Sequence, residues 1–426
     1  MQATMSTMSW KPRYFDIGVN ISDLVFTGGL RHRHASHAAL VLSRGRLVGV
    51  ETHLITSLTL HDSESNLALG DSRLLFCTVG VHPCLAGQEF YTRKRGTLSD
   101  SEPHFSEVLH PSHIQRFNEL ASVATEGHKS GVIRAFGELG LDYDRLHFLS
   151  KPQQQYVFRK QLETFSLLEF ELPYFLHMRA ACDDFIDIIS TYVKKGLRGV
   201  VHSFTGSEND LQKLLLLGFY VSVNGCSLRT EENLQVAAQI PLDKLMIETD
   251  APYCEFRKNS PARKLYITPY PNKFLPAFLE PVQRQLNDLL AALAAQKQNQ
   301  SAQRQKENHH RQTGGELPAK TTAKNSMAVH PLVPFVLAKS GDLEHYKELV
   351  ESLAEQHTST EPNLFAKDGA LESPILLGRN EPLFVAHVAE VMAGLHKLES
   401  EVDVQKFIDQ IYDNTCKFFG VDPADH

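Results

Sequence analysis

The chain contains 426 residues, of which 42% are hydrophobic, and carries a formal net charge of −7. This length is sufficient for one large domain with insertions or for two smaller domains. The acidic balance argues against a long basic face for duplex nucleic acid, but not against a nuclease that contacts only a few phosphates through a metal.

The first 13 residues contain no acidic side chain and include Lys11 and Arg13. We expect a disordered N-terminus at residues 1–13, with an organellar targeting segment as the alternative. No apolar stretch reaches the roughly 18 residues needed to span a bilayer, and no hydrophobic region of a signal peptide follows the start. We therefore expect an intracellular protein of the cytoplasm or nucleus, with the mitochondrion as the alternative, and no membrane partner.

Eight apolar runs bounded by turn residues predict β-strands. They are Tyr14–Val19, His53–Ser57, Leu74–Val79, Val132–Phe136, Tyr174–Leu176, Gly199–Val201, Phe219–Val223 and Leu245–Thr249. The segments between them indicate helices, of which the clearest follows Ser150, a predicted N-cap, and continues at helical spacing to Leu168. Eight strands alternating with helices favour a (β/α)₈ TIM-like barrel over an open sheet, and we place this α/β fold at residues 14–273.

Residues 274–373 are predicted to form an insertion, because the regular alternation stops after Tyr253. From about residue 283 to residue 325 the chain is rich in Gln, Ala, Lys, Asn and His, which predicts a disordered or loosely helical segment. This segment is also the only locally basic region of the sequence, so an auxiliary nucleic-acid arm is the alternative interpretation. We expect one short helix within the insertion, at residues 345–353.

Residues 374–418 are predicted to form the helices that close the barrel. Regular structure returns at Arg379-Asn380-Glu381-Pro382, and Pro382 is expected to begin a helix with one apolar face. The residues of that face are Phe384, Val385, Val388, Val391 and Met392.

Four of the predicted strands end in a side chain that can bind a metal. These side chains are Glu138, His177, His202 and Asp250. Because the carboxyl ends of parallel strands meet at one mouth of a barrel, we expect the four to lie together. Two imidazoles and two carboxylates can hold Zn²⁺ or Mn²⁺, or Mg²⁺ where carboxylates and water dominate. For any one of these residues alone, a hydrogen-bonded role in the core or a loop is the alternative, but the recurrence predicts a metal-dependent hydrolase.

Other polar residues are expected at the same mouth. His82 follows the third strand and could shuttle a proton, donate to a phosphate or cap a loop. Arg179 could clamp a phosphate, with a salt bridge as the alternative, and Glu248, Asp142 and Asp144 could orient the metal ligands. The sequence contains neither a Gly-x-Ser-x-Gly nucleophile motif nor a phosphate-binding glycine loop, and its six cysteines include no Cys-x-x-Cys pair. Attack by metal-activated water is therefore favoured over a covalent intermediate.

The order and spacing of several motifs resemble the TatD family of metal-dependent deoxyribonucleases, of the eukaryotic type, within the amidohydrolase-like superfamily. The matching motifs are residues 15–23 (FDIGVNISD), 80–83 (GVHP), 137–142 (GELGLD), 176–179 (LHMR), 201–206 (VHSFTG), 224–228 (NGCSL), 248–252 (ETDAP) and 379–382 (RNEP). They cover roughly residues 14–273 and 374–418. The resemblance implies a distorted (β/α)₈ barrel that hydrolyses DNA phosphodiesters, as an exonuclease and in some relatives an endonuclease, with Mg²⁺ as the usual metal and Mn²⁺ or Zn²⁺ as alternatives.

Transferred residue by residue, the resemblance assigns metal binding to Glu138, His177, His202 and Asp250, and an accessory active-site role to His82. Many relatives carry His-x-His after the first strand, whereas this chain has Gly18 and Asn20 there. A second metal would therefore need Asp16, Asn20 or water as substitute ligands. Cys84 replaces a further family histidine, and we interpret it as a thiol, with a thiolate ligand as the alternative.

The expected mechanism uses one or two divalent ions, with Asp250 as general base and with Arg179 and His82 neutralising charge on the phosphate. The acidic net charge favours DNA ends or single strands as the substrate, because few phosphate contacts are then needed. Two alternatives remain at this point: a barrel hydrolase of another ester or amide, and a catalytically weakened binding protein.

Overall fold

The computed structural model describes residues 10–28, 36–71, 73–94, 105–288, 290–291, 295, 327–343, 346–348 and 373–422. The chain divides into two compact units, Met1–Ile267 with Asn380–His426, and Thr268–Arg379. The sequence places the corresponding boundaries at residues 273/274 and 373/374. Residues 1–9 of the expected disordered N-terminus, almost all of the low-complexity segment and most of the helix expected at residues 345–353 lie outside the described residues.

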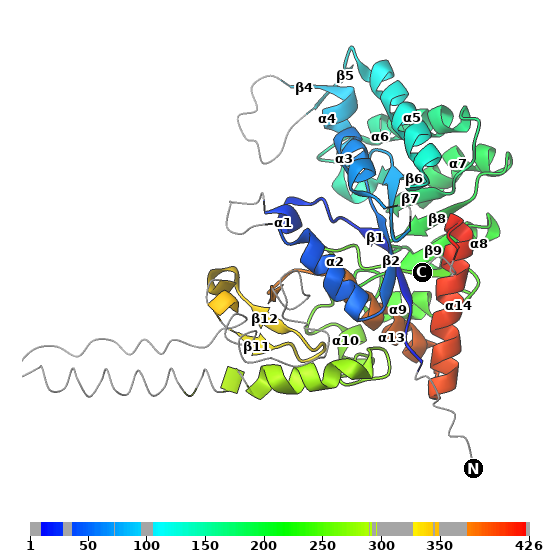
Figure 1. Cartoon of the computed structure of the whole chain (residues 1–426). Coiled ribbons are helices and arrows are strands. Elements are labelled where there is room, and N and C mark those ends of the chain that lie inside the picture. The colour runs from blue at the N-terminus through cyan, green and yellow to red at the C-terminus, as the bar shows by residue number, and fades with distance from the viewer. Residues whose placement is uncertain are drawn as a thin grey trace, which may run out of the picture. The chain divides into compact units, whose positions relative to one another are not determined.

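The first unit is built on one sheet of eight parallel strands (Figure 1). In their order in the sheet, the strands are β1 (Tyr14–Val19), β2 (Val50–Ile55), β3 (Leu75–Val79), β6 (Ile133–Asp142), β7 (Tyr174–Arg179), β8 (Gly199–His202), β9 (Tyr220–Val223) and β10 (Leu245–Ile247). A parallel bridge between Val19 and Ala251 links the end of β1 to the residues after β10, so the sheet forms a nearly closed barrel. The predicted (β/α)₈ fold is confirmed, and every predicted strand belongs to this sheet.

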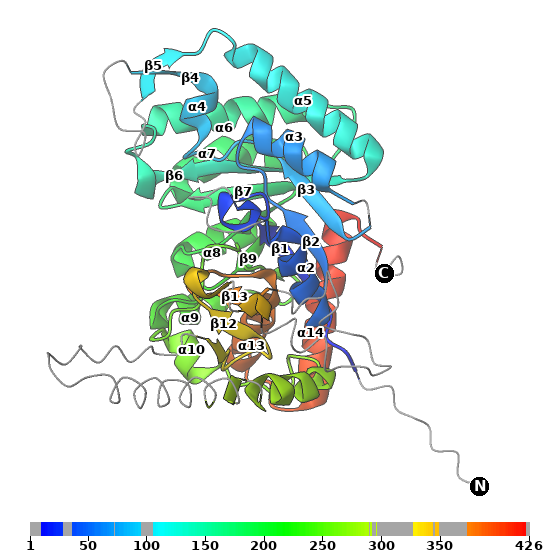
Figure 2. The same cartoon turned by 60° about the vertical axis from the view of Figure 1, so that its left-hand side comes forward.

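The helices of this unit follow the strands in the chain and lie outside the barrel (Figure 2). They are α1 (Leu24–Thr27), α2 (Ala38–Leu47), α3 (Leu60–Leu69), α4 (Ala86–Phe90), α5 (His113–Ser130), α6 (Lys151–Ser166), α7 (Cys182–Val193), α8 (Glu208–Leu216), α9 (Glu231–Ala237), α10 (Pro261–Leu265), α13 (Val385–Leu395) and α14 (Glu401–Phe419). Helix α6 begins as predicted, with a capping box between Ser150 and Gln153, but it ends before Leu168.

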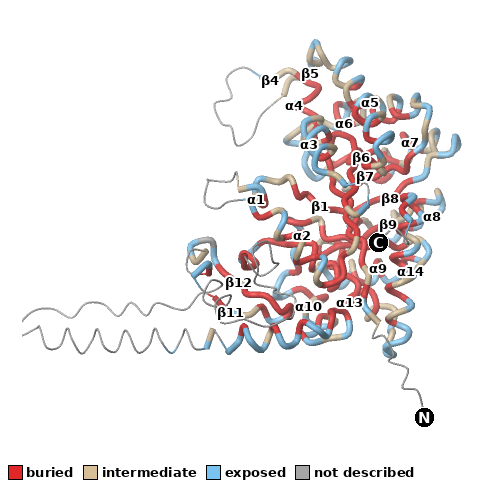
Figure 3. The backbone as a smooth tube through the Cα atoms, in the orientation of Figure 1, coloured by how far each residue is buried: buried red, intermediate tan, exposed pale blue. Residues whose placement is uncertain are grey.

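Buried residues are concentrated on the barrel strands, whereas the outer faces of the helices are exposed (Figure 3). One core cluster joins residues near the beginnings of the strands, including Phe15, Phe76 and Phe175, to the C-terminal half of α14. In that cluster the rings of Phe15 and Phe419 lie 5.7 Å apart. This apolar cluster therefore fills the end of the barrel where the strands begin. Polar side chains can then gather at the opposite end, where the strands finish.

The C-terminal segment differs in detail from the expected closing helix. Pro382–Phe384 forms a 3₁₀ turn, and α13, which follows it, is buried on all sides rather than on one face. Both α13 and α14 contact β1 and β10, so they cover the seam of the barrel. The segment is held by a fully buried ion pair, in which the Arg44 guanidinium donates to Glu381 at 2.8 and 2.9 Å.

Several elements have no counterpart in the sequence prediction. In the first unit, β4 (Tyr91–Arg93) and β5 (Phe105–Leu109) form an antiparallel pair. In the second unit, β11 (Ala328–Val329), β12 (Val336–Ala338) and β13 (Ile375–Leu376) form a small sheet. Residues 280–288 are helical, and they overlap the start of the segment that the sequence predicts to be disordered or loosely helical. Within the described residues, no helix combines the length and the apolar composition needed to cross a membrane.

Candidate metal centre

A cavity of about 640 Å³ opens at the end of the barrel where the strands finish. Seven of the eight residues predicted for the site line it, namely Asn20, His82, Glu138, His177, Arg179, His202 and Asp250. The eighth, Asp16, is not among the described residues that line the cavity. The strand ends therefore bring the predicted side chains to one place.

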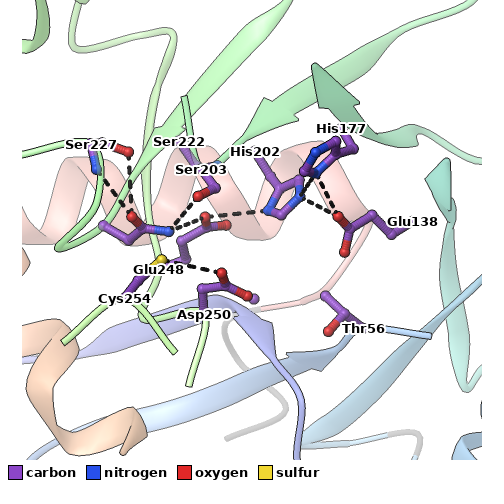
Figure 4. A network of polar contacts seen from close by, with 12 residues as sticks. Thr56, Glu138, His177, His202, Ser203, Ser222, Ser227, Glu248, Asp250 and Cys254 are labelled. Atoms are coloured by element: carbon purple, nitrogen blue, oxygen red, sulfur yellow. Dashed lines mark hydrogen bonds and ion pairs between the residues drawn. The ribbon is translucent and has the colours of Figure 1, made fainter. Parts of the chain in front are cut away.

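One carboxylate oxygen forms the centre of the cluster (Figure 4). Glu138 Oε1 lies 2.7 Å from His202 Nε2, 2.9 Å from His177 Nδ1 and 3.2 Å from His82 Nε2. His82, Glu138 and His177 form a group whose donor atoms are close enough together to share a metal ion. His202 Nε2 adjoins this group, 3.4 Å from His177 Nδ1. We refer to these four residues as the histidine cluster.

The outer nitrogen of each ring has its own polar partner. These pairs are His82 Nδ1 with the Cys84 amide (3.1 Å), His177 Nε2 with Asp142 Oδ2 (3.3 Å) and His202 Nδ1 with Glu248 Oε1 (3.4 Å). Hydrogen bonds hold the rings of His177 and His82, whereas Glu248 lies beside His202 Nδ1 as a charge partner without a hydrogen bond among the described residues. Imidazoles that bind a metal usually donate their outer N–H to an oxygen, as His177 can to Asp142, whereas His82 Nδ1 accepts from the Cys84 amide. The donor set therefore fits a divalent cation.

Strand register accounts for the convergence. Gly140 pairs with His177 across β6 and β7, and His177 pairs with His202 across β7 and β8. A Cβ atom on Gly140 would lie 1.9 Å from the carbonyl oxygen of His177, so only glycine permits this approach of the two strands. Glu138 lies two residues before Gly140 on the same strand. Its carboxylate therefore reaches the rings of His177 and His202.

The charges in the cluster stabilise one another. Burial alone would raise the pKa of Glu138, but the neighbouring histidines outweigh burial and hold it well below its ordinary value. Burial alone would lower the pKa of His202, but the carboxylates of Glu138 and Glu248 hold it well above its ordinary value. For His82 burial dominates, and its pKa is lowered. The Glu138 carboxylate is thus ionised, and the inner nitrogens are sites that a proton or a metal cation can occupy.

Asp250 lies beside the histidine cluster rather than within it. Its carboxylate accepts hydrogen bonds from Asn20 Nδ2 at 3.0 Å and from the Cys254 thiol at 3.3 Å. Within the described part of the chain, it has no hydrogen bond or ion pair to the cluster. Burial, together with the carboxylates of Glu248 and Glu138, raises the pKa of Asp250 to about 7. A carboxylate with such a pKa can exchange a proton near neutral pH.

The positions where many relatives carry His-x-His are filled in a different way. A Cβ on Gly18 would lie 2.9 Å from Glu248 Oε2, so Glu248 occupies the space that a larger residue would need. Asn20 is held between Thr56 and Asp250. Both oxygens of Asp16 accept hydrogen bonds from Thr249, and the carboxylate is fully buried. Asp16 therefore joins β1 to the segment after β10 and is not directed at the cavity.

Two asparagines support the site, and the sequence analysis assigned them no role. Asn224 donates to Glu248 Oε1 at 3.0 Å and to the Ser203 hydroxyl at 2.8 Å. Asn380 donates to the carbonyl oxygens of Thr249 and Tyr253, on either side of Asp250. Both asparagines belong to motifs that resemble the family, at residues 224–228 and 379–382. Membership in these motifs is the sequence feature that could have marked them as site residues.

Arg179 and Cys84 are also located by the structure. Arg179 lines the cavity and pairs with Asp144, with 2.7 Å between Nη2 and Oδ2 and with nearly half of each side chain exposed. The expected alternative, a salt bridge, is thus present, and it leaves the guanidinium at the cavity edge. The Cys84 thiol donates to Asp142 at 3.6 Å, and burial raises its pKa, so Cys84 is a thiol.

The chain matches known proteins along most of its length. Residues 15–300 match the model of the family described as TatD related DNase. The chain is 40% identical over 263 residues to the deoxyribonuclease Tat-D of Schizosaccharomyces pombe, covering 61% of this chain and 78% of the relative. It is 31% identical over 292 residues to the 3'-5' ssDNA/RNA exonuclease TatD of Erwinia tasmaniensis, covering 66% and 95%. The crystal structure of an uncharacterized amidohydrolase from Saccharomyces cerevisiae superposes with a TM-score of 0.65 at 28% identity, covering 96% of this chain and all of the other. The chain belongs to the family of TatD-related DNases.

Proposed function

We propose that this protein is a metal-dependent deoxyribonuclease that uses water as the nucleophile. The observation that carries this proposal is the histidine cluster, in which three imidazole nitrogens converge on Glu138 Oε1 while the outer side of each ring is held by another polar group. Its relatives named as deoxyribonucleases and as an exonuclease of single-stranded DNA and RNA support DNA as the substrate.

His82, Glu138, His177 and His202 would hold the divalent cation. When bound, the cation lowers the pKa of a water molecule and polarises the scissile phosphate. The family resemblance favours Mg²⁺, whereas a donor set rich in imidazole is better suited to Mn²⁺ or Zn²⁺. Asp250 stands apart from the cluster, so it would contribute as a ligand only in the presence of substrate or of a second ion.

The other polar residues of the cavity have separate roles in this proposal. Asp250 accepts the proton of the attacking water, and Asn20 and Cys254 hold its carboxylate in place. Arg179 exchanges its contact with Asp144 for a phosphate oxygen, to which a guanidinium can donate two parallel hydrogen bonds. The cavity of about 640 Å³ has room for a chain end or an extruded nucleotide, which favours single strands and DNA ends.

The test is digestion of end-labelled single-stranded and duplex oligonucleotides with Mg²⁺, Mn²⁺ or Zn²⁺ titrated in, and with the metal content measured on the same sample. We expect cleavage that depends on metal and that is lost in Glu138→Gln and strongly reduced in Asp250→Asn. A matched control is Glu169→Gln, which removes an exposed carboxylate that is not among the residues lining the described cavity. Retention of most activity in both site variants would contradict the proposal.

The same experiment separates the alternatives. A panel of small esters and amides tested in parallel would identify a barrel hydrolase of a different substrate. A protein that binds no divalent metal and cleaves nothing would be a binding protein. The intact histidine cluster argues against a binding protein, because a scaffold has no need to bury converging histidines that must be partnered.

A further inference from the structure

Two cysteines with opposite chemical surroundings meet in the wall of the cavity. Cys226 lies in the turn after β9, Cys254 lies in the loop after β10, and both line the cavity as half-buried free thiols. Each of the two side chains is the largest influence on the pKa of the other. The proposed hydrolysis uses Cys254 only to hold the Asp250 carboxylate and gives Cys226 no role.

The backbone keeps the two loops in contact. A Cβ atom on Gly225 would lie 2.0 Å from the carbonyl oxygen of Cys254 and 3.2 Å from the carbonyl carbon of Glu255. The loops therefore touch one residue away from Cys226, and only glycine allows this distance. Asn224 Oδ1 accepts hydrogen bonds from the amides of Cys226 and Ser227 and fixes the turn. A disulfide requires two loops that approach this closely.

The surroundings of the two sulfur atoms differ in charge. Arg229 Nη2 donates to Cys226 Sγ at 2.9 Å, whereas the Cys254 thiol donates to the carboxylate of Asp250. The neighbouring Cys254 side chain, together with the cationic groups of Arg229, Arg179 and Arg257, lowers the pKa of Cys226 to about 7 against the opposing effect of burial. A thiol with these neighbours is the nucleophilic member of a pair, and the second thiol is the resolving member.

We propose that Cys226 and Cys254 are a peroxide-sensitive thiol pair, and that their oxidation to a disulfide withdraws Cys254 from Asp250. The Cys226 thiolate attacks one oxygen of hydrogen peroxide, the O–O bond breaks, and a sulfenic acid and hydroxide are formed. The Cys254 sulfur then attacks the sulfenic sulfur, the S–O bond breaks, and the thiol proton leaves with the hydroxyl group as water. Two sulfur atoms together lose two electrons, and one peroxide is reduced.

The disulfide changes the cavity in two ways. Asp250 loses one of its two hydrogen-bond donors, which leaves Asn20 alone to hold the carboxylate. The loops after β9 and β10 become covalently joined beside it. The expected decrease in DNA cleavage rests on the proposed nuclease function, whereas formation of the disulfide does not.

The test begins with the reduced full-length chain, which has six thiols. After treatment with about one equivalent of hydrogen peroxide, we expect four free thiols and a tryptic cross-link between residues 214–229 and residues 245–257. In Cys254→Ser, dimedone should label Cys226 as the sulfenic acid, and Cys226→Ser should form no cross-link. Arg229→Gln should slow the oxidation by about threefold or more, because the thiolate is less stabilised. Cys182→Ser, which alters a thiol that does not line the described cavity, should behave as the wild type.

DNA cleavage is measured on the same samples, and each variant is compared with its own reduced form. We expect oxidation to decrease cleavage by the wild type, dithiothreitol to restore it, and Cys226→Ser to be insensitive to peroxide. Six remaining thiols, or a cross-link that uses Cys84 instead, would overturn the pair. A correct cross-link with unchanged cleavage would overturn the effect on Asp250. If the reduced protein cleaves no DNA with any metal, the nuclease proposal fails, and the thiol count still decides whether the pair exists.

Discussion

Replacing Glu248 by Gln should weaken metal binding, although Glu248 is not one of the proposed ligands. Its carboxylate is fully buried and lies 3.4 Å from His202 Nδ1, on the side of the ring away from the cluster. The variant keeps the volume of the side chain and an oxygen for Asn224, but it removes the negative charge beside His202 Nδ1 that raises the pKa of this ring. Glu248→Gln therefore tests whether the outer partners of the histidines serve a metal.

The size of the effect follows from the contact that is lost. Removing an outer partner of a metal-binding histidine typically lowers metal affinity or activity about 10- to 100-fold, which corresponds to about 1.4–2.7 kcal/mol of binding free energy. Among the described residues, Glu248 Oε2 has no hydrogen-bond partner, and it adjoins Gly18, so the new amide group would lack an acceptor there. That buried donor should cost about 1–3 kcal/mol of folding stability, which has to be measured separately.

The assay is calorimetric titration of the metal-free protein with Mn²⁺, with thermal unfolding of the same metal-free sample as the measure of folding. Glu169→Gln serves as the control for the loss of one negative charge. A Glu248→Gln variant that folds and binds Mn²⁺ within threefold of the wild type would refute the reasoning. In that event, the contact between His202 and Glu248 would contribute to the packing of the core and not to metal binding.

Four further predictions concern the ion pair of the C-terminal segment, the response to acid, the role of the metal and the role of Arg179. Arg44→Met should lower the free energy of unfolding by about 3–5 kcal/mol because it removes the cation that faces the buried Glu381 carboxylate. Adding Glu381→Leu should recover most of this loss in urea unfolding, and additive losses would contradict the prediction. Burial lowers the pKa of His53 to about 3. Between pH 6.5 and this value, His53 is therefore protonated in the unfolded chain and neutral in the folded chain. Stability should therefore fall by about 1.4 kcal/mol per pH unit between pH 6.5 and pH 3 on account of this residue, and His53→Gln should show a pH slope that is smaller by one proton. Chelation of the metal should abolish DNA cleavage and lower the melting temperature of the protein. Arg179→Ala should raise KM for the oligonucleotide more than it lowers kcat. An unchanged KM would mean that Arg179 only pairs with Asp144 and does not contact the substrate.

The strands and the main site residues could be predicted because each depends on a local pattern. A buried strand of a barrel is an apolar run, and its carboxyl end is the place where a polar residue can reach the cavity, so Glu138, His177 and His202 were identifiable one at a time. Their relative positions depend on the alignment of neighbouring strands. The pairing of His177 with His202 is a property of the β7–β8 register, which no local pattern contains.

The remaining features depend on contacts between distant segments. His82 adjoins Glu138 because β3 pairs with β6, although two further strands and two helices lie between β3 and β6 in the chain. Asp16 lies two residues before Gly18 in the chain, so the sequence suggests that it could reach the site. Its hydrogen bonds to Thr249 instead direct its side chain into the barrel wall. The uniform burial of α13 also follows from packing, since its sequence alone predicts a single apolar face.

The placement of Asp250 has a different origin from that of the histidine cluster. The cluster is set by the register of four adjacent strands, β3, β6, β7 and β8. In contrast, Asp250 follows the end of β10 and has a φ of 55°, which non-glycine residues rarely adopt. Asn380 binds the carbonyl oxygens on both sides of it, and the ion pair between Arg44 and Glu381 holds Asn380's own segment. A segment more than a hundred residues further along the chain thus fixes the proposed general base. The long insertion can therefore vary without disturbing the site only as long as the Arg379-Asn380-Glu381-Pro382 segment still reaches its place beside β10.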